Sequence, residues 1–171
     1  MIKIFKNSLI KGIVTQRINT VNPELSKEIR AAGQELHTVI NKKFSRSFHI
    51  RQVDTGSCGA CESEIIATTN PIYDIQRFGI DFVASPRHAD ALLVTGPVSK
   101  NMELALLRTY EAMPEPKLVI TLGNCALNGG LFSKSYYTVN KVSDIIPVVY
   151  HIPGCPPKPL EIIKALTKIL F

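Results

Sequence analysis

Long hydrophobic runs are absent from this sequence of 171 residues. No apolar stretch approaches the roughly 18 residues that a membrane-spanning helix requires, so no membrane span is predicted. Residues 1–11 interrupt their apolar side chains with lysine too often for a signal peptide, and no twin-arginine pair occurs. Internal repeats are also absent. We therefore expect a cytosolic chain, built as one domain or as a domain with an extension.

Acidic residues are fewer than basic ones, at 14 against 20, which gives a formal net charge of +6. Such an excess can indicate nucleic acid, an anionic membrane surface or an acidic protein partner, and it does not choose between them. Lysine and arginine are spread along the chain without interleaved aromatic residues. We therefore expect no nucleic-acid partner.

Cysteine is scarce too, but its placement is informative. In a parallel α/β sheet the carboxyl ends of the strands share one edge, and such folds bind ligands there. We therefore expect cysteines that follow strands to meet at that edge. All four cysteines lie just past a strand-like run: Cys58 and Cys61 after residues 49–53, Cys125 after 118–122, and Cys155 after 148–152.

Four cysteines on such an edge suit zinc or an iron-sulfur cube, while a disulfide pair or unrelated core thiols are simpler interpretations. A zinc ribbon usually brings two close Cys-x-x-Cys pairs, whereas only Cys58 and Cys61 are close here. Two isolated ligands from separate strand ends suit a cluster wider than a single ion. A helix starting at Cys58 to Cys61 would also direct its free amides toward an anionic cube. The residues favour an iron-sulfur cluster and leave zinc and coincidental thiols open.

Glu64 is a candidate proton relay because it lies three residues after Cys61. On a helix this spacing places the carboxylate on the same face as the cysteine. The simpler interpretation is a first-turn glutamate that the helix dipole favours, and Glu62 is assigned to that class.

Residues 1–46 differ from the rest of the chain. Pro23-Glu24 can start a helix whose apolar side chains recur at spacings of three and four. This face either packs on the chain's own domain or docks on a partner subunit. Its members are Leu25, Ile29, Ala32, Leu36, Val39 and Ile40.

From residue 48 onward, strand-like and helical patterns alternate, which argues for a three-layer α/β sandwich. Residues 126–145 form a long connection, of a kind that is often functional. Strands are expected at 49–53, 82–84, 90–96, 118–122 and 148–152, and helices after Cys61, before Gly79, and at 101–113 and 160–170.

Four segments, in this order, resemble the small subunit of nickel-iron hydrogenases and the related 20 kDa, or B, subunit of respiratory complex I. They are Asp54-Thr-Gly-Ser-Cys-Gly-Ala-Cys-Glu-Ser-Glu64, Ala84-Ser-Pro-Arg-His-Ala-Asp-Ala-Leu-Leu-Val-Thr-Gly-Pro97, Met113-Pro-Glu-Pro-Lys-Leu-Val-Ile-Thr-Leu-Gly-Asn-Cys-Ala126 and Ile152-Pro-Gly-Cys-Pro-Pro157. The resemblance implies a flavodoxin-like fold with a mostly parallel sheet. It also implies that Cys58, Cys61, Cys125 and Cys155 hold one 4Fe-4S cluster next to the catalytic site of a large partner subunit. Glu64 matches the family's glutamate.

Complex I subunits present the first two cysteines side by side, whereas Cys58 and Cys61 have the Cys-x-x-Cys spacing of hydrogenases. Uptake hydrogenases add an export signal and a second cluster-bearing domain, and neither is recognised here. The resemblance therefore favours the membrane-bound, energy-converting hydrogenases, including formate hydrogenlyase and hydrogenase-4. In this interpretation residues 1–46 serve subunit docking and residues 47–171 form the cluster domain.

The resemblance further implies an oxidoreductase subunit that relays electrons and does not catalyse alone. Its expected partners are a large subunit holding nickel and iron, or a nickel-free relative of it, together with ferredoxin-like iron-sulfur subunits and membrane subunits. The complex would form a cytoplasmic, peripheral arm on the inner face of the cell membrane. The closest alternative is the cluster-bearing subunit of a complex I-like quinone reductase. A zinc-stabilised binding module is the alternative outside this class.

Overall fold

The computed structural model describes residues 22–139 and 141–171, and its centre is a five-stranded sheet. The strand order is β2-β1-β3-β5-β7, and every neighbouring pair in this sheet is parallel. This is the strand order of flavodoxin-like folds. The strands are β1 (Phe48–Asp54), β2 (Ile80–Phe82), β3 (Ala91–Thr95), β5 (Leu118–Leu122) and β7 (Tyr150–Ile152).

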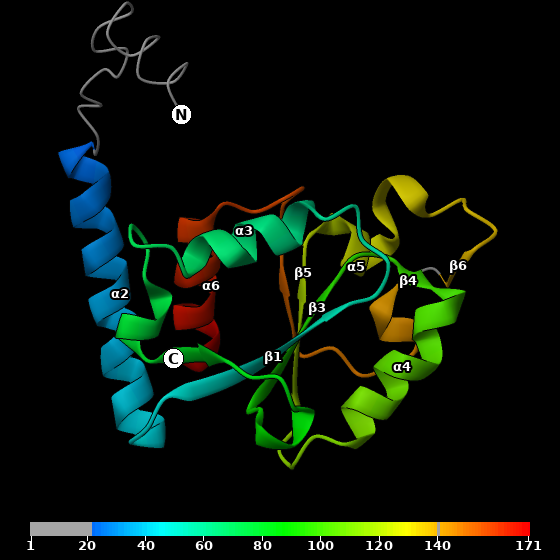
Figure 1. Ribbon diagram of the computed structural model, residues 1–171, viewed down its shortest axis with the longest axis horizontal. Helices are drawn as coiled ribbons and strands as arrows, with labels where there is room; N and C mark the ends of the chain where they lie inside the picture. The colour runs from blue at the N-terminus through cyan, green and yellow to red at the C-terminus, as the bar shows by residue number, and fades with distance from the viewer. Residues whose placement is uncertain (1–21, 140) are drawn as a thin grey trace, which may run out of the picture.

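Helices cover both faces of the sheet, and Figure 1 shows α2, α3 and α6 on one side of β1 with α4 on the other. One core cluster includes Leu36, Ile50 and Ile163, and the other includes Val94 and Leu106. The predicted three-layer α/β architecture is confirmed. The helices are α2 (Pro23–Phe44), α3 (Ala60–Thr68), α4 (Lys100–Glu111), α5 (Asn124–Asn128) and α6 (Pro159–Leu170).

Helix α2 confirms the helix predicted for the amino-terminal segment. The Asn22 side chain caps it by accepting a hydrogen bond from the Glu24 amide at 3.1 Å. Its apolar face is part of the main core, because Ile29, Leu36 and Ile40 are all buried. This face packs on the chain's own α/β domain, mainly against α6. Residues 1–21 lie outside the described part of the chain. Within the described part, none of the helices combines the length and the apolar character needed to cross a bilayer.

Several segments differ from the sequence-based expectations. Strand β7 begins at Tyr150 instead of residue 148, and the helix expected before Gly79 is a 3-10 turn at Ile75–Phe78. Strand β2 begins at Ile80, two residues earlier than the expected 82–84, because Gly79 ends the preceding 3-10 helix and Ile80 then pairs with Phe48 on β1. The connection 126–145 also contains regular structure. Its β6 (Thr138–Val139) pairs antiparallel with β4 (Val98–Ser99), a contact between distant residues that local patterns do not reveal.

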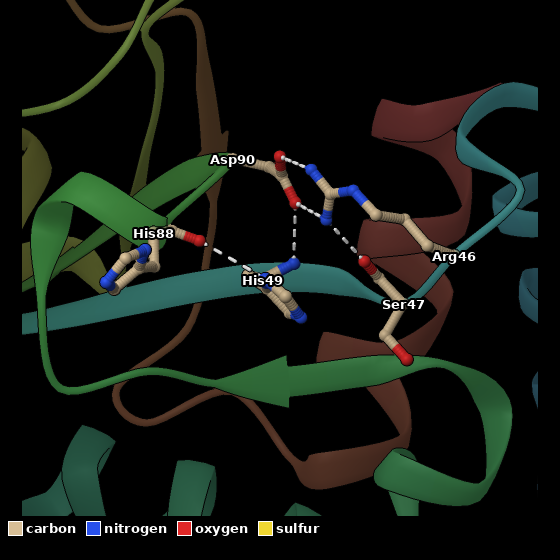
Figure 2. Close-up of polar contacts among 5 residues, drawn as sticks. All are labelled: Arg46, Ser47, His49, His88 and Asp90. Atoms are coloured by element: carbon tan, nitrogen blue, oxygen red, sulfur yellow. Dashed lines mark hydrogen bonds and ion pairs between the residues drawn. The ribbon is translucent and has the colours of Figure 1, made fainter.

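At the amino edge of the sheet, an ion pair joins Arg46, in the segment before β1, to Asp90, the residue before β3 (Figure 2). The Arg46 guanidinium donates to both oxygens of Asp90, at 2.9 and 2.6 Å, and also to the Ser47 carbonyl at 2.8 Å. The His49 amide donates to Asp90 at 2.8 Å. Burial alone would raise the pKa of Asp90, but these hydrogen bonds and the positive charge of Arg46 hold it below its usual value.

Candidate metal centre

The loop between β1 and α3 carries the first two cysteines and is anchored to the end of β3. The Thr55 hydroxyl is fully buried and donates to the Thr95 carbonyl at 2.8 Å. One carboxylate oxygen of Asp54 accepts from the amides of Gly56 and Ser57, both at 2.8 Å. These bonds fix the path of the chain as it leaves the sheet, and they hold the cysteine loop at the carboxyl edge.

Helix α3 begins directly inside the Cys-x-x-Cys segment. Gly59 is its N-cap, so Cys61 lies in the first turn and Cys58 just before the helix. Cys58 is exposed and Cys61 is partly buried. The free amides of a first helical turn and the positive end of the helix dipole favour an anionic group at this position. The predicted helix start at Cys58 to Cys61 is therefore confirmed.

The other two cysteines come from neighbouring strands that are tied together directly beyond their ends. The Asn124 amide donates to the Gly154 carbonyl at 2.8 Å, and the Gly154 amide donates to the Asn124 side chain at 3.2 Å. As a result Cys125 and Cys155 line one open pocket of about 460 Å³.

Two glycines make room for the sulfur atoms. A Cβ on Gly123 would lie 2.6 Å from the sulfur of Cys61, and a Cβ on Gly130 would lie 2.6 Å from the sulfur of Cys125. Both distances are shorter than non-bonded atoms tolerate. Both glycines also have positive φ angles, of 87° and 53°, which residues with side chains rarely adopt. The backbone is thus shaped so that the Cys61 and Cys125 thiols can lie at this edge.

The four thiols are close enough to influence each other's ionisation. Burial and neighbouring negative charges raise the pKa of Cys61 to about 12. Burial also raises the pKa of Cys125, which the backbone amide of Leu131 partly opposes by hydrogen bonding to the sulfur. Thiolates at this edge therefore require a positively charged group to compensate them. Burial is the largest cause of the raised pKa of Cys61. The neighbouring charges that add to it are, in decreasing order, those of Glu62, Cys125, Cys58 and Cys155.

The geometry narrows the alternatives for these cysteines. All four thiols are free, so they form no disulfide, and the exposure of Cys58 and Cys155 does not suit coincidental core thiols. Within residues 22–139 and 141–171, no three Cys, His, Asp or Glu side chains are grouped closely enough for a single metal ion. Sulfur donors suit both zinc and iron-sulfur clusters, and the spread of the four thiols around one edge favours the wider cluster. The ligand role of the four cysteines stays a prediction.

The two glutamates near Cys61 differ in their surroundings. Glu64 is half-buried, and among the described residues no group forms a hydrogen bond or ion pair with its carboxylate. Its role as a proton relay stays a prediction. Glu62 accepts a hydrogen bond from the Ser57 hydroxyl at 2.6 Å, and its other oxygen is buried. The sequence alone predicts only a helix-dipole role for Glu62, because no local pattern indicates the contact with Ser57.

Comparisons with known proteins show the family of this chain. A family profile described as NADH ubiquinone oxidoreductase, 20 Kd subunit, matches residues 58–169. Formate hydrogenlyase subunit 7 of Escherichia coli is 47% identical over 118 residues, which cover 69% of this chain and 46% of that protein. The probable membrane-bound hydrogenase subunit mbhJ of Pyrococcus furiosus is 44% identical over 129 residues, covering 75% of this chain and 77% of that protein.

A solved structure supports the same relationship. It is a chain in the structure of the membrane-bound sulfane sulfur reductase, described as an archaeal respiratory membrane complex. The two chains are 32% identical, with a TM-score of 0.66, and the match covers 77% of this chain and 73% of the other. The profile alone spans well over half of this sequence, including all four cysteines. This chain belongs to the family of the 20 kDa subunit of NADH ubiquinone oxidoreductase, and its relatives include hydrogenase subunits.

Proposed function

We propose that this chain is the electron-relay small subunit of a multi-subunit, energy-converting nickel-iron hydrogenase. It holds one 4Fe-4S cluster next to the active site of the large subunit and passes electrons between that site and ferredoxin-like subunits. The observation that carries this proposal is the arrangement of the cysteines. Thiols from three separate strand ends meet at one edge of the sheet, and two of them are exposed.

In this proposal each of the four cysteines supplies one thiolate. When bound, the cluster accepts one electron and gives it up again. The Leu131 amide stabilises the thiolate of Cys125, and the amino-terminal turn of α3 faces the negative charge of the site. Cys58 and Cys155 are exposed, so this edge is accessible to the partner that exchanges electrons.

The Cys-x-x-Cys spacing and the hydrogenase relatives favour the hydrogenase branch. A second candidate is the same relay in a quinone reductase or in a hydrogenase-related complex without nickel. The family description names NADH ubiquinone oxidoreductase, and the similar solved chain comes from a sulfane sulfur reductase. Both functions use the same cysteines in this chain. The large subunit decides between them, because a nickel site requires two Cys-x-x-Cys pairs there.

Glu64 is proposed as a proton relay between the large subunit and solvent. Its carboxylate lies one helical turn from Cys61 and has no partner within the described residues, so it is available to a group on another subunit. A carboxyl group can both accept and donate a proton, which a relay requires.

The complex is proposed to form a peripheral arm on the inner face of the cell membrane, anchored by membrane subunits. Residues 1–46 are proposed to contribute to docking. Deleting all of them would remove Leu36 and Ile40 from the core, so the sharper test is a chain that starts at Asn22. We expect that variant to keep its fold and its cluster and to co-purify less with the membrane subunits. Unchanged co-purification would show that residues 1–21 do not dock.

The central test is anaerobic purification of the chain within its complex, with metal analysis and EPR of the reduced sample. We expect about four iron and four sulfide per chain for the site of this subunit, and a brown colour from thiolate-to-iron charge transfer. Zinc in place of iron would overturn the cluster assignment. Hydrogen turnover by the assembled complex tests the partner. A loaded relay in a complex that reduces quinone or sulfane sulfur without hydrogen turnover would favour the second candidate.

A further inference from the structure

Glu62 is connected to the start of α3 through a serine. One oxygen of its carboxylate accepts from the Ser57 hydroxyl at 2.6 Å, and the same hydroxyl accepts from the Gly59 amide at 3.1 Å. Gly59 is the N-cap of the helix. Ser57 therefore links the first free amide of α3 to a carboxylate in its first turn, and this link encloses Cys58.

A simple capping role does not account for the second oxygen of Glu62. In a capping box, the glutamate at this position bonds directly to the N-cap amide, and solvent can satisfy its free oxygen. Here the second oxygen is buried, and among the described residues it has no hydrogen-bond partner. A buried carboxylate oxygen without a donor costs free energy, so capping alone gives no reason for its position.

The carboxylate is instead located beside the cysteine loop. Glu62 directly follows Cys61 in the first turn of α3, and the oxygen that does not bond to Ser57 is enclosed by the protein. Glu64 lies two residues further along the same helix, and the Ser57 hydroxyl donates to Glu62 instead. The carboxylate of Glu62 is therefore held next to the cysteine loop from within the protein.

We propose that Glu62 is a positioning residue that holds the Cys58 loop through Ser57 and lowers the reduction potential of the cluster through its charge. This inference rests on the proposed function. Reduction of the cluster adds one electron, supplied by a ferredoxin-like donor, and no covalent bond forms or breaks. A fixed negative charge beside the site makes that additional electron less favourable, and low dielectric surroundings strengthen the effect.

Three variants of the full complex test the proposal by redox titration followed by EPR. Glu62→Gln keeps the shape and an oxygen that can accept from Ser57, but it removes the charge. We expect full iron content and a midpoint potential above that of the wild type. Ser57→Ala keeps the charge and removes the link, so we expect a potential near wild type and a changed EPR line shape. Glu64→Gln is the matched control, and we expect a smaller shift from it.

An unchanged potential in cluster-loaded Glu62→Gln would overturn the inference, as would an equal shift in Glu64→Gln. If Glu62→Gln loses its cluster, Glu62→Asp replaces it, because aspartate restores the charge on a shorter side chain. A loaded Glu62→Asp with a potential near wild type supports the proposal, and a potential raised despite the restored charge contradicts it. Absence of a 4Fe-4S signal from the wild type would instead refute the proposed function, so the two failures are distinguishable.

Discussion

The amino and carboxyl edges of the sheet both bring together residues that are distant in sequence. They differ in whether the negatively charged groups are balanced by partners within the chain. At the amino edge, Asp90 is matched by the guanidinium of Arg46 and by a backbone amide (Figure 2). At the carboxyl edge, four thiols lie together with the carboxylate of Glu62, one oxygen of which has no partner in the described chain.

By this difference the amino edge has the character of a structural site, whereas the carboxyl edge is the one that we propose to be functional. The amino edge is electrostatically complete, so its ion pair can hold the fold together without any other group. The carboxyl edge gathers groups that become anionic and provides few donors to balance them. If these thiols bind a cluster as thiolates, as we propose, the iron supplies the positive charge that compensates them.

The largest expected effect is the loss of the cluster when one of its thiolates is removed. We expect Cys125→Ser to lose or degrade the 4Fe-4S cluster, because thiolate is the ligand that iron-sulfur centres prefer. Iron analysis and the EPR spectrum of the reduced complex measure the effect. If iron content and spectrum were unchanged, Cys125 would not be a ligand, and the carboxyl edge would lose its distinction from the amino edge.

The matched control for this variant is Ser133→Ala. Ser133 lines the same pocket as Cys125 and Cys155, but its hydroxyl is a poor ligand for iron-sulfur centres. We expect normal iron content in this variant. A loss equal to that of Cys125→Ser would indicate that the pocket is sensitive to any change, and the cysteine result would then say little about ligation.

The second largest effect is expected at the carboxyl edge, for the substitution of Glu64. We expect Glu64→Gln to keep the cluster and to reduce hydrogen turnover by roughly 100-fold or more, because the amide keeps the shape but cannot carry the proton. If Glu64 only favours the helix start, the change should cost at most about 1 kcal/mol of local stability. Near-normal hydrogen evolution by an assembled, fully loaded Glu64→Gln complex would show that Glu64 is not a proton relay and only favours the helix start.

Much of the fold follows from local patterns in the sequence. The largely apolar run Leu118–Leu122 corresponds to β5 residue for residue, because a strand buried on both faces leaves a clear signal. The helical spacing at residues 25–40 likewise predicts α2. The start of β2 and the pairing of β6 with β4 were not predictable, because contacts with distant residues determine them.

Part of the candidate site was likewise predictable from the sequence, and part of it was not. The positions of the four cysteines after strand ends predicted one shared edge, since parallel strands place their carboxyl ends together. The role inferred for Glu62 was not predictable. Its identity as a first-turn glutamate has a sufficient local explanation, and only the fold shows that Ser57 bonds to one oxygen and that the other is buried.

The smallest expected effect concerns the amino edge. We expect Asp90→Asn to lower the free energy of unfolding by about 1 kcal/mol at neutral pH, because the pair with Arg46 is bidentate but half open to solvent. The folded-state pKa of Asp90 is lowered, so the carboxylate stabilises the fold above its unfolded pKa of about 3.9. This contribution disappears as the pH falls through the lower, folded-state pKa.

Denaturant unfolding of both forms between neutral and acidic pH measures this effect, and the difference between them should shrink on acidification. Glu115→Gln is the control, because Glu115 is 79% exposed and lies 3.8 Å from Lys117, and we expect no measurable change from it. Iron content and EPR spectrum should stay normal in Asp90→Asn, since the ion pair lies at the opposite end of the strands from the cysteines. Loss of the cluster in this variant would show that the two edges are coupled and that the amino edge is not merely structural.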